Sequence, residues 1–205
     1  MKKWTTFAAV AILGAGASSI ALRGQTPIAQ AAEATTVSFD KKVAAFSLPD
    51  PAGKSTLVGD WAKSKATVLL FVATKCPVSN DYNTRMASLA KAYSGKGVKF
   101  VGINSNKAEL GPEVAAHTKE NGFDFVVLKD PQNKIADRFD AKVTPEAYVI
   151  GPKGDLLYHG RIDNSQQEAE VKDKSLAVAL DSILAGKPVA EKETRAFGCS
   201  IKREG

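Results

Sequence analysis

The chain has 205 residues, of which 44% are hydrophobic and 24% are charged, as expected for one globular domain with a full core. This composition excludes collagen, coiled-coil rods and wholly disordered chains. The 28 basic and 22 acidic residues give a formal net charge of +6, which would suit a nucleic-acid or membrane partner if the excess lay in the folded domain.

The first 31 residues, 1–31, have the layout of a secretory signal peptide, with Lys2 and Lys3 before an apolar run and the letters AQA at the end. The apolar run is shorter than the ~20 residues of a spanning helix, so an uncleaved anchor, which alone would bring membrane contact, is the second choice. Cleavage would remove three basic residues and no acidic one, leaving 25 basic and 22 acidic residues. We therefore expect no nucleic-acid partner and a periplasmic location, where disulfides form.

A polar linker at 32–42 leads into the predicted domain, 43–186. Its central element is the run ATVLLFVA at 66–73, which is continuously apolar and rich in β-branched residues, as in a strand buried on both faces. Apolar residues then recur every three or four positions over 78–94, which predicts a helix. The remaining expected elements are a strand at 43–48, a turn at 49–53, a helix at 57–63, a strand at 98–103, a helix at 110–121, a strand at 123–128, a helix at 134–139, a hairpin of strands at 147–150 and 156–159, and a helix at 173–185. This alternation predicts an α/β fold with parallel pairing, in which a central mixed sheet is flanked by helices.

Cys76 is the first candidate for chemistry. It follows the buried strand and precedes Pro77, a residue favoured at the first helical position. Unpaired N–H groups and the positive dipole end at a helix N-terminus stabilise a thiolate, and the charge of Lys75 adds to this, so we expect a lowered pKa for the Cys76 thiol. The alternative is that Cys76 is simply a small buried hydrophobic residue.

The second cysteine, Cys199, lies in a polar tail at 187–205. Two cysteines so far apart in sequence are neither a disulfide-stapled scaffold nor a zinc-finger pair. About a dozen residues separate Cys199 from the last helix, and at up to ~3.3 Å each they can bring it back to Cys76. Geometry therefore permits a disulfide between the two without requiring one. We expect Cys199 to resolve an intermediate formed on Cys76, with a static structural bridge and an unpaired thiol as the alternatives.

These features together resemble the thioredoxin-like superfamily, and within it the exported redoxins related to AhpC/TSA peroxiredoxins and to periplasmic thiol-disulfide oxidoreductases. The resemblance spans residues 40–185 and rests on the ordered combination of KCPVS, VTPEAYVI and the hairpin GPKGDLLYHGRID. It implies that the bond before Pro145 is cis and that Thr144 offers its backbone to the substrate, with Pro77 as a further positioning residue. Only about 5–6% of X-Pro bonds are cis, so Pro145 alone would read as a turn proline.

The sequence departs from both resembled groups. Thioredoxin-type exchangers carry C-x-x-C, whereas the letters here are CPVS, so Ser79 replaces the second thiol and no local disulfide can close. Peroxiredoxins carry P-x-x-x-[TS]-x-x-C, but Leu69 and Ala73 occupy the two pocket positions here, with Thr74 displaced by one. Each standard mechanism therefore lacks a part, which Cys199 could supply.

Three residues are candidates for tuning the Cys76 thiolate, namely Lys75, Ser79 and Arg85. As a helix residue, Arg85 could equally be a solvated side chain. The two histidines, His117 and His159, have no second ligand residue at metal spacing, so neither a metal nor a cofactor is expected.

We therefore expect an exported thiol-dependent redox enzyme in which Cys76 attacks a disulfide or a peroxide and Cys199 resolves the product. Its substrates would be protein thiols and disulfides or peroxides, and an external reductant or oxidant would complete the cycle. The alternative is a non-catalytic binding module that holds a partner peptide, or a soft metal such as Cu(I), on its thiolates.

Overall fold

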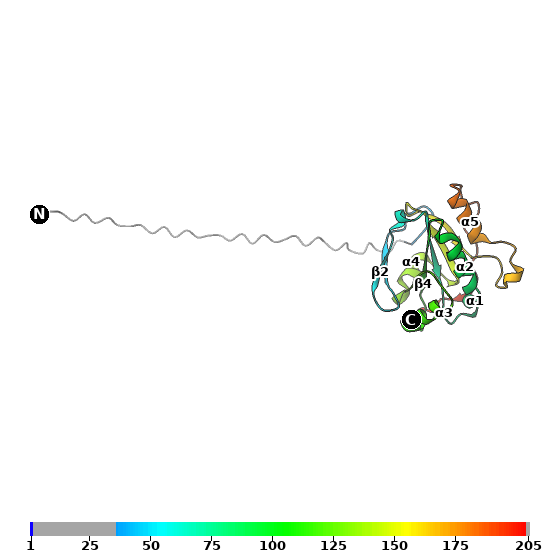
Figure 1. Ribbon diagram of the computed structural model, residues 1–205, viewed down its shortest axis with the longest axis horizontal. Coiled ribbons are helices and arrows are strands. Elements are labelled where there is room, and N and C mark those ends of the chain that lie inside the picture. Colours follow the sequence, from blue (N-terminus) through cyan, green and yellow to red (C-terminus); the bar gives the residue numbers. More distant parts are fainter. Residues whose placement is uncertain (2–35, 204–205) are drawn as a thin grey trace. The chain divides into compact units, whose positions relative to one another are not determined.

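A computed structural model describes Met1 and residues 36–203 of the chain (Figure 1). The expected signal peptide, apart from Met1, and the first part of the expected linker lie outside the described residues. The chain divides into two units, and the account below concerns the second, Ala34–Gly205. Within the described residues, every helix is too short or too polar to span a bilayer.

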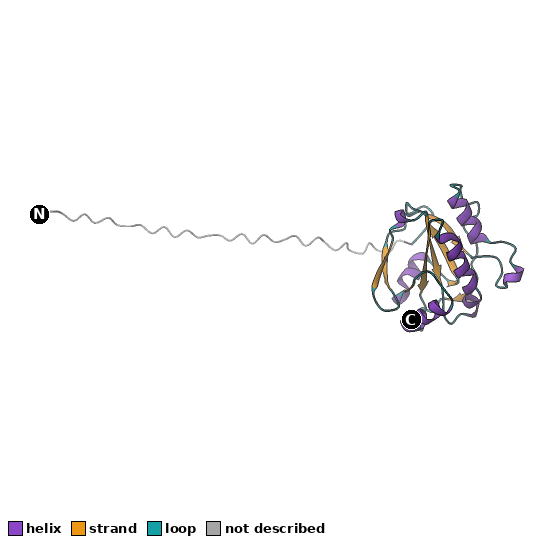
Figure 2. Cartoon of the chain, in the orientation of Figure 1, coloured by secondary structure: helices purple, strands orange, loops and turns teal. Residues whose placement is uncertain are grey.

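The second unit is built on a five-stranded mixed sheet with the strand order β5-β4-β3-β7-β8 (Figure 2). The strands are β3 (Ala66–Phe71), β4 (Val98–Asn104), β5 (Val127–Lys129), β7 (Glu146–Ile150) and β8 (Leu156–Gly160). β3, β4 and β5 are parallel, whereas β7 runs antiparallel to β3 and β8 to β7. The expected mixed sheet and its parallel half are confirmed.

The sheet separates two hydrophobic cores. Along β3, Val68 and Leu70 belong to one core, and Leu69 and Phe71 belong to the other, because successive side chains of a strand point to opposite faces. Figure 1 shows α2 and α5 on one side of the sheet, and α4 with β2 on the other. The helices are α2 (Asn83–Ser94), α3 (Gly111–Glu120), α4 (Lys134–Phe139) and α5 (Ser175–Leu184). All six residues of β3 are buried, as its continuous apolar run predicts.

The prediction of a helix at 57–63 is largely wrong. The chain instead turns back on itself after β1 (Phe46–Pro49) and forms β2 (Ser55–Val58), which pairs antiparallel with it. Only a 3₁₀ turn, Trp61–Lys63, is helical there. The buried Trp61 side chain packs in the core and donates its indole N–H to the carbonyl of Val43 at 2.8 Å, a long-range contact that overrides local helix propensity.

Two of the other differences from expectation concern a helix and a strand. The helix expected over 78–94 is divided into α1 (Pro77–Asp81) and α2, which meet at the buried Tyr82. The strand expected at 123–128 shortens to β5, because Phe123 and Phe125 stack on each other at 4.7 Å and pack into the first core ahead of the ladder. Both corrections are local and leave the order of the sheet unchanged.

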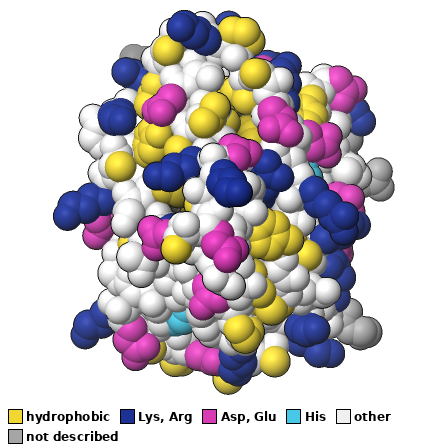
Figure 3. Space-filling view, turned by 90° about the vertical axis from the view of Figure 1, so that its right-hand side faces the viewer, with side chains coloured by type: hydrophobic (Ala, Val, Ile, Leu, Met, Phe, Trp, Pro, Cys, Tyr) yellow, Lys and Arg dark blue, Asp and Glu magenta, His cyan; other side chains and the backbone are white. Residues whose placement is uncertain are grey.

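The C-terminal tail adds a short third sheet. β9 (Cys199–Ser200) pairs antiparallel with β6 (Val143–Thr144), a two-residue strand just before β7. Ile201, the next residue, is buried in the second core. On the face seen in Figure 3, basic side chains lie among acidic and apolar ones.

Candidate functional site

Cys76 lies where β3 gives way to the first helix. It is the N-cap residue of α1, Pro77 occupies the first turn, and the cysteine side chain is almost fully buried. The backbone N–H of Ser79 points at the Cys76 sulfur over 3.3 Å. The sulfur therefore occupies the position at which a capping side chain accepts a hydrogen bond, as the strand-to-helix junction predicts.

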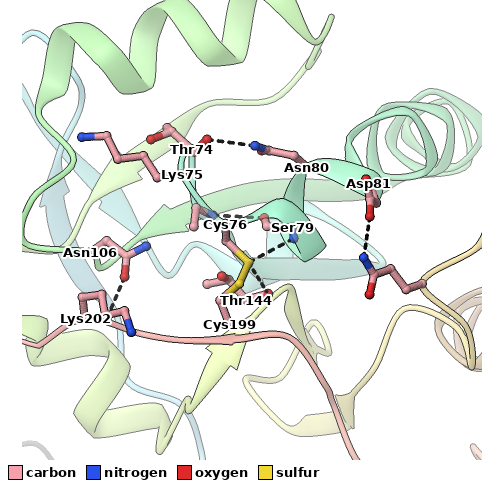
Figure 4. Close-up of a disulfide and its surroundings, with 12 residues drawn as sticks. Thr74, Lys75, Cys76, Ser79, Asn80, Asp81, Asn106, Thr144, Cys199 and Lys202 are labelled. Atoms are coloured by element: carbon pink, nitrogen blue, oxygen red, sulfur yellow. Dashed lines mark hydrogen bonds between the residues drawn. A yellow bond between two sulfur atoms is a disulfide. The ribbon is translucent and has the colours of Figure 1, made fainter.

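The second cysteine reaches this sulfur. Cys76 and Cys199 form a disulfide with a Cα–Cα distance of 5.9 Å (Figure 4). Thr144 pairs with Cys199 in the β6–β9 ladder, and its carbonyl oxygen lies 3.5 Å from the Cys76 sulfur. The Thr144–Pro145 peptide bond is cis. The structure thus brings together four of the residues singled out in the sequence, from three distant segments.

Contacts on both sides of Cys199 hold the tail. Before it, the Phe197 ring packs edge-on against Tyr82, with 6.2 Å between ring centroids. After it, Ile201 is buried and the N–H of Lys202 donates to the side-chain oxygen of Asn106 at 2.7 Å. None of these contacts involves a sulfur atom, so the tail has anchors besides the disulfide.

Ser79 and Lys75 serve the turn in different ways. The Ser79 side chain is fully buried, and its hydroxyl accepts the backbone N–H of Ala73 at 3.2 Å, so it fixes the turn that presents the sulfur. The Lys75 ammonium points away from the disulfide and pairs with Glu113 at 3.0 Å (Figure 4). The Lys75 hydrogen bond is the main cause that lowers the pKa of Glu113. Lys75 therefore directs its charge mainly at an acidic partner.

Arg85 does not turn towards the cysteine. Its buried guanidinium pairs with Asp163 at 2.7 Å and donates to the carbonyl oxygens of Ser165 and Gln166. The same group lies over the Tyr82 ring, 3.6 Å from its centroid. These contacts fasten the loop after β8 to α2, and a tuning role of Arg85 at the thiolate stays a prediction.

Two polar residues beside the cysteine turn contact each other, Asn80 and the histidine His117. Asn80 donates to the carbonyl oxygen of Thr74 at 3.0 Å, and its own side-chain oxygen lies 2.9 Å from a ring nitrogen of His117. Burial lowers the pKa of His117 from its ordinary value. The spacing of Asn80 and His117 in the sequence carries no signal for this contact, since it joins two different helices.

A buried carboxylate supports the loop that carries Thr144. Glu146 accepts the backbone N–H groups of Lys142 at 2.8 Å and Val143 at 3.1 Å, and its other oxygen lies 2.6 Å from a ring nitrogen of His159. Burial raises the pKa of Glu146, but the hydrogen bonds from His159 and the two backbone N–H groups outweigh it and leave the pKa below its usual value. The ionised form of Glu146 is therefore favoured in the folded protein.

Glu146→Gln is expected to destabilise the protein at pH 7 by about 1–3 kcal/mol, the usual cost of leaving buried donors unpaired. Because the pKa is lowered by folding, this stabilisation is present above the unfolded value of about 4.3 and is lost as the pH falls through the folded value. Urea denaturation of wild type and variant at pH 7 and at about pH 3.5 measures both. A difference in stability that stays the same at the two pH values would contradict this assignment.

Among the described residues, no three side chains of the His, Cys, Asp and Glu types are grouped so as to hold a metal ion. Both sulfur atoms are joined to each other. A bond of this kind opens by reduction and closes by oxidation.

Several known structures share this architecture. A hypothetical protein of Sinorhizobium meliloti 1021 is 30% identical, with 83% of this chain and 97% of that chain covered and a TM-score of 0.75. An uncharacterized conserved protein of Geobacillus kaustophilus is 32% identical, with coverages of 80% and 91% and a TM-score of 0.74. A protein described as a thiol:disulfide interchange protein DsbE, from Chlorobium tepidum, is 19% identical, with coverages of 73% and 99% and a TM-score of 0.60, and shows the fold alone. The fold is thioredoxin-like, and the Cys76–Cys199 disulfide within it supports a redox function.

The sequence itself gives the family. A profile of the AhpC/TSA family matches residues 39–159, more than half of the chain. The protein therefore belongs to the AhpC/TSA family, as the resemblance of its motifs predicts. No curated protein matches it. Family and disulfide together support an oxidoreductase function in general.

Proposed function

We propose that the protein is an exported thiol-disulfide oxidoreductase in which Cys76 is the nucleophile and Cys199 the resolving cysteine. The observation that carries this proposal is the Cys76–Cys199 disulfide, which lies against the Thr144 backbone. An extended segment with a cysteine already occupies that position, so a substrate segment of the same shape would present its sulfur to Cys76. Export rests on the layout of residues 1–31 in the sequence.

The proposed cycle starts from the reduced protein. The Cys76 thiolate attacks one sulfur of a substrate disulfide, and the other substrate sulfur leaves as a thiolate that takes up a proton. The Cys199 thiolate then attacks the Cys76 sulfur of this mixed disulfide and displaces the second substrate thiol. The substrate gains two electrons and the protein becomes the Cys76–Cys199 disulfide. An external dithiol returns the protein to its starting state by the same exchange in reverse.

The first attack depends on the thiolate at Cys76. The Ser79 N–H that reaches the sulfur would donate to the thiolate, and a hydrogen bond to the charged form favours it. The Cys76 side chain is buried, and its sulfur is bonded to Cys199 of the tail. Displacement of the tail would thus open the sulfur to a substrate and free the backbone of β6 at the same time.

Peroxide reduction is the second candidate, and the AhpC/TSA match favours it. In that reaction Cys76 would take one peroxide oxygen as a sulfenic acid and release water, and Cys199 would then form the disulfide with loss of a second water. Ala73 occupies the position at which peroxiredoxins carry the pocket Thr or Ser. The next residue, Thr74, has a hydroxyl, but this hydroxyl donates to Glu113 at 3.2 Å. We therefore place disulfide exchange first. Comparing peroxide consumption with insulin reduction separates the two activities.

A redox titration of the protein without residues 1–31 tests the proposal, with free thiols counted by alkylation and mass. We expect both cysteines to convert together as a two-electron couple between about −120 and −270 mV, the range of thiol-disulfide enzymes. A bridge that resists reduction below about −300 mV would instead make it a static structural disulfide. Two thiols that titrate separately, or copper retained through purification, would favour the binding-module alternative.

A further inference from the structure

A buried carboxylate, Glu109, lies directly behind the cysteine turn. It is 3% exposed and precedes α3. One of its oxygens accepts the backbone N–H of Thr74 at 2.8 Å, and the other accepts that of Lys75 at 3.1 Å. These are the two residues immediately before Cys76, so both oxygens of one side chain hold the backbone that leads to the sulfur.

The same carboxylate reaches the tail through one more residue. The Asn106 side-chain amide donates to Glu109 at 3.0 Å, while its oxygen accepts the backbone N–H of Lys202 at 2.7 Å (Figure 4). The N–H of Lys107 in turn donates to the carbonyl oxygen of Lys202 at 3.1 Å. A continuous hydrogen-bonded path therefore runs from the cysteine turn through Glu109 and Asn106 to the tail, three residues beyond Cys199.

Charge and burial support a carboxylate at this place. The amide of Asn104 adds a fourth donor, at 2.5 Å, so each oxygen of Glu109 accepts two hydrogen bonds. The Lys129 ammonium donates to the backbone oxygen of Asn106 at 3.1 Å, and attraction to Glu109 opposes the burial that lowers the pKa of Lys129. A glutamine could not replace this carboxylate, because its amide nitrogen would face donors instead of accepting from them.

We propose that Glu109 is a positioning residue, which sets the cysteine turn and the docked tail in the relative geometry that lets the Cys199 sulfur reach the Cys76 sulfur. This rests on the proposed function, since it concerns the second step of the exchange. The carboxylate makes no bond to either sulfur and acts through the backbone N–H groups of Thr74 and Lys75 and through Asn106. Loss of the Glu109 carboxylate would loosen both the cysteine turn that carries Cys76 and the tail that carries Cys199.

The test is the rate of disulfide closure in the full two-cysteine protein. The reduced protein is mixed with oxidised glutathione, samples are quenched in acid, and the glutathione adduct at Cys76 and the closed disulfide are counted by mass. Glu109→Gln should slow the conversion of adduct to closed disulfide at least about tenfold, since small displacements of reacting groups carry penalties of this size or more. Asp130→Asn is the matched control, because Asp130 is also buried and accepts backbone N–H groups, those of Ile135 and Ala136.

A second readout separates positioning from general destabilisation. In a Cys199→Ser background, Glu109→Gln should move the pH profile of Cys76 alkylation to lower pH. The substitution removes a negative charge that contacts the backbone of the two residues before Cys76. Asn106→Ala, which detaches only the tail side, should slow closure and leave that profile unchanged. It also decides the matter if Glu109→Gln fails to fold, which a thermal melt shows.

The outcomes distinguish this inference from the function on which it depends. If the wild type closes its disulfide and Glu109→Gln has the same closure rate and the same alkylation profile, the positioning role is overturned. The proposed function then still stands. Equal slowing by Asp130→Asn overturns it as well, since any buried carboxylate would then suffice. If Asn106→Ala closes at the wild-type rate, the hydrogen-bonded path through Asn106 has no part in positioning the tail, and the proposal is wrong on that point. A wild-type protein that forms no adduct at Cys76 contradicts the proposed function itself.

Discussion

Replacing Cys199 by serine is expected to leave Cys76 held in a mixed disulfide with its substrate, because nothing then displaces the substrate thiol. With oxidised glutathione as the probe, intact mass should show one glutathione per chain that persists in the variant and disappears in the wild type. Catalytic reduction of insulin should fall at least about a hundredfold, since the second step of the exchange is lost. Full turnover by this variant would exclude a resolving role for Cys199.

Cys76→Ser is the matched control, because it removes the other sulfur of the same bridge. Its remaining thiol, Cys199, should form the glutathione adduct much more slowly than Cys76 does in Cys199→Ser. Its activity in insulin reduction should fall at least ~10³-fold, within the range for removal of a covalent nucleophile. Both variants lack the disulfide equally, so any difference between them reports chemistry rather than stability. If they behaved alike in adduct formation, the order of attack assigned to the two cysteines would be wrong.

Adding a methyl group at Gly198 is expected to have the second large effect. A Cβ at this position would lie 2.1 Å from the carbonyl oxygen of Thr144, closer than real Cβ atoms approach. The obstacle is backbone, so the tail rather than a flexible side chain must move. Gly198→Ala should therefore displace Cys199 from Cys76 and slow disulfide closure by about a hundredfold, the order of loss expected from a shift of about 1 Å.

Gly186→Ala is the control variant, because it adds a methyl group at a glycine of positive φ without a steric clash. Gly186 has φ +68°, and a Cβ there would meet nothing within 4 Å. The substitution should cost about 1 kcal/mol in stability, the price of a left-handed alanine, and should leave closure as fast as in the wild type. The closure assay with oxidised glutathione measures both variants. Rapid closure in Gly198→Ala would mean that the tail docks in another way.

Much of the fold could be predicted because local patterns carry it. The letters ATVLLFVA alone indicate a strand buried on both faces, and GPKG between two apolar runs indicates the final hairpin. The division at Tyr82 and the strand β2 were missed, since both depend on contacts with segments far away in sequence. Periodicity reports which face of an element is apolar and says little about which partner covers it.

The candidate site likewise has some features that local sequence predicts and others that depend on distant contacts. The position of Cys76 before Pro77 follows from the order of strand, turn and helix, and the reach of the tail permits a bridge to Cys199. By contrast, nothing around Glu109 in the sequence points to the cysteine turn, because its partners lie 34 and 35 positions away. The ion pair of Arg85 could not be predicted for the same reason, since its acidic partner is 78 positions away.

The anchors on either side of Cys199 bear on the reductant that the protein can use. Since Phe197 and Ile201 hold the tail without the sulfurs, they keep the Cys199 thiol at a high effective concentration beside Cys76 after the bridge opens. A reductant with a single thiol would be expelled by Cys199 before a second molecule arrived. In the proposed cycle a reductant with two thiols would complete the transfer within one encounter, so we expect the protein to accept electrons from a dithiol faster than from a single thiol.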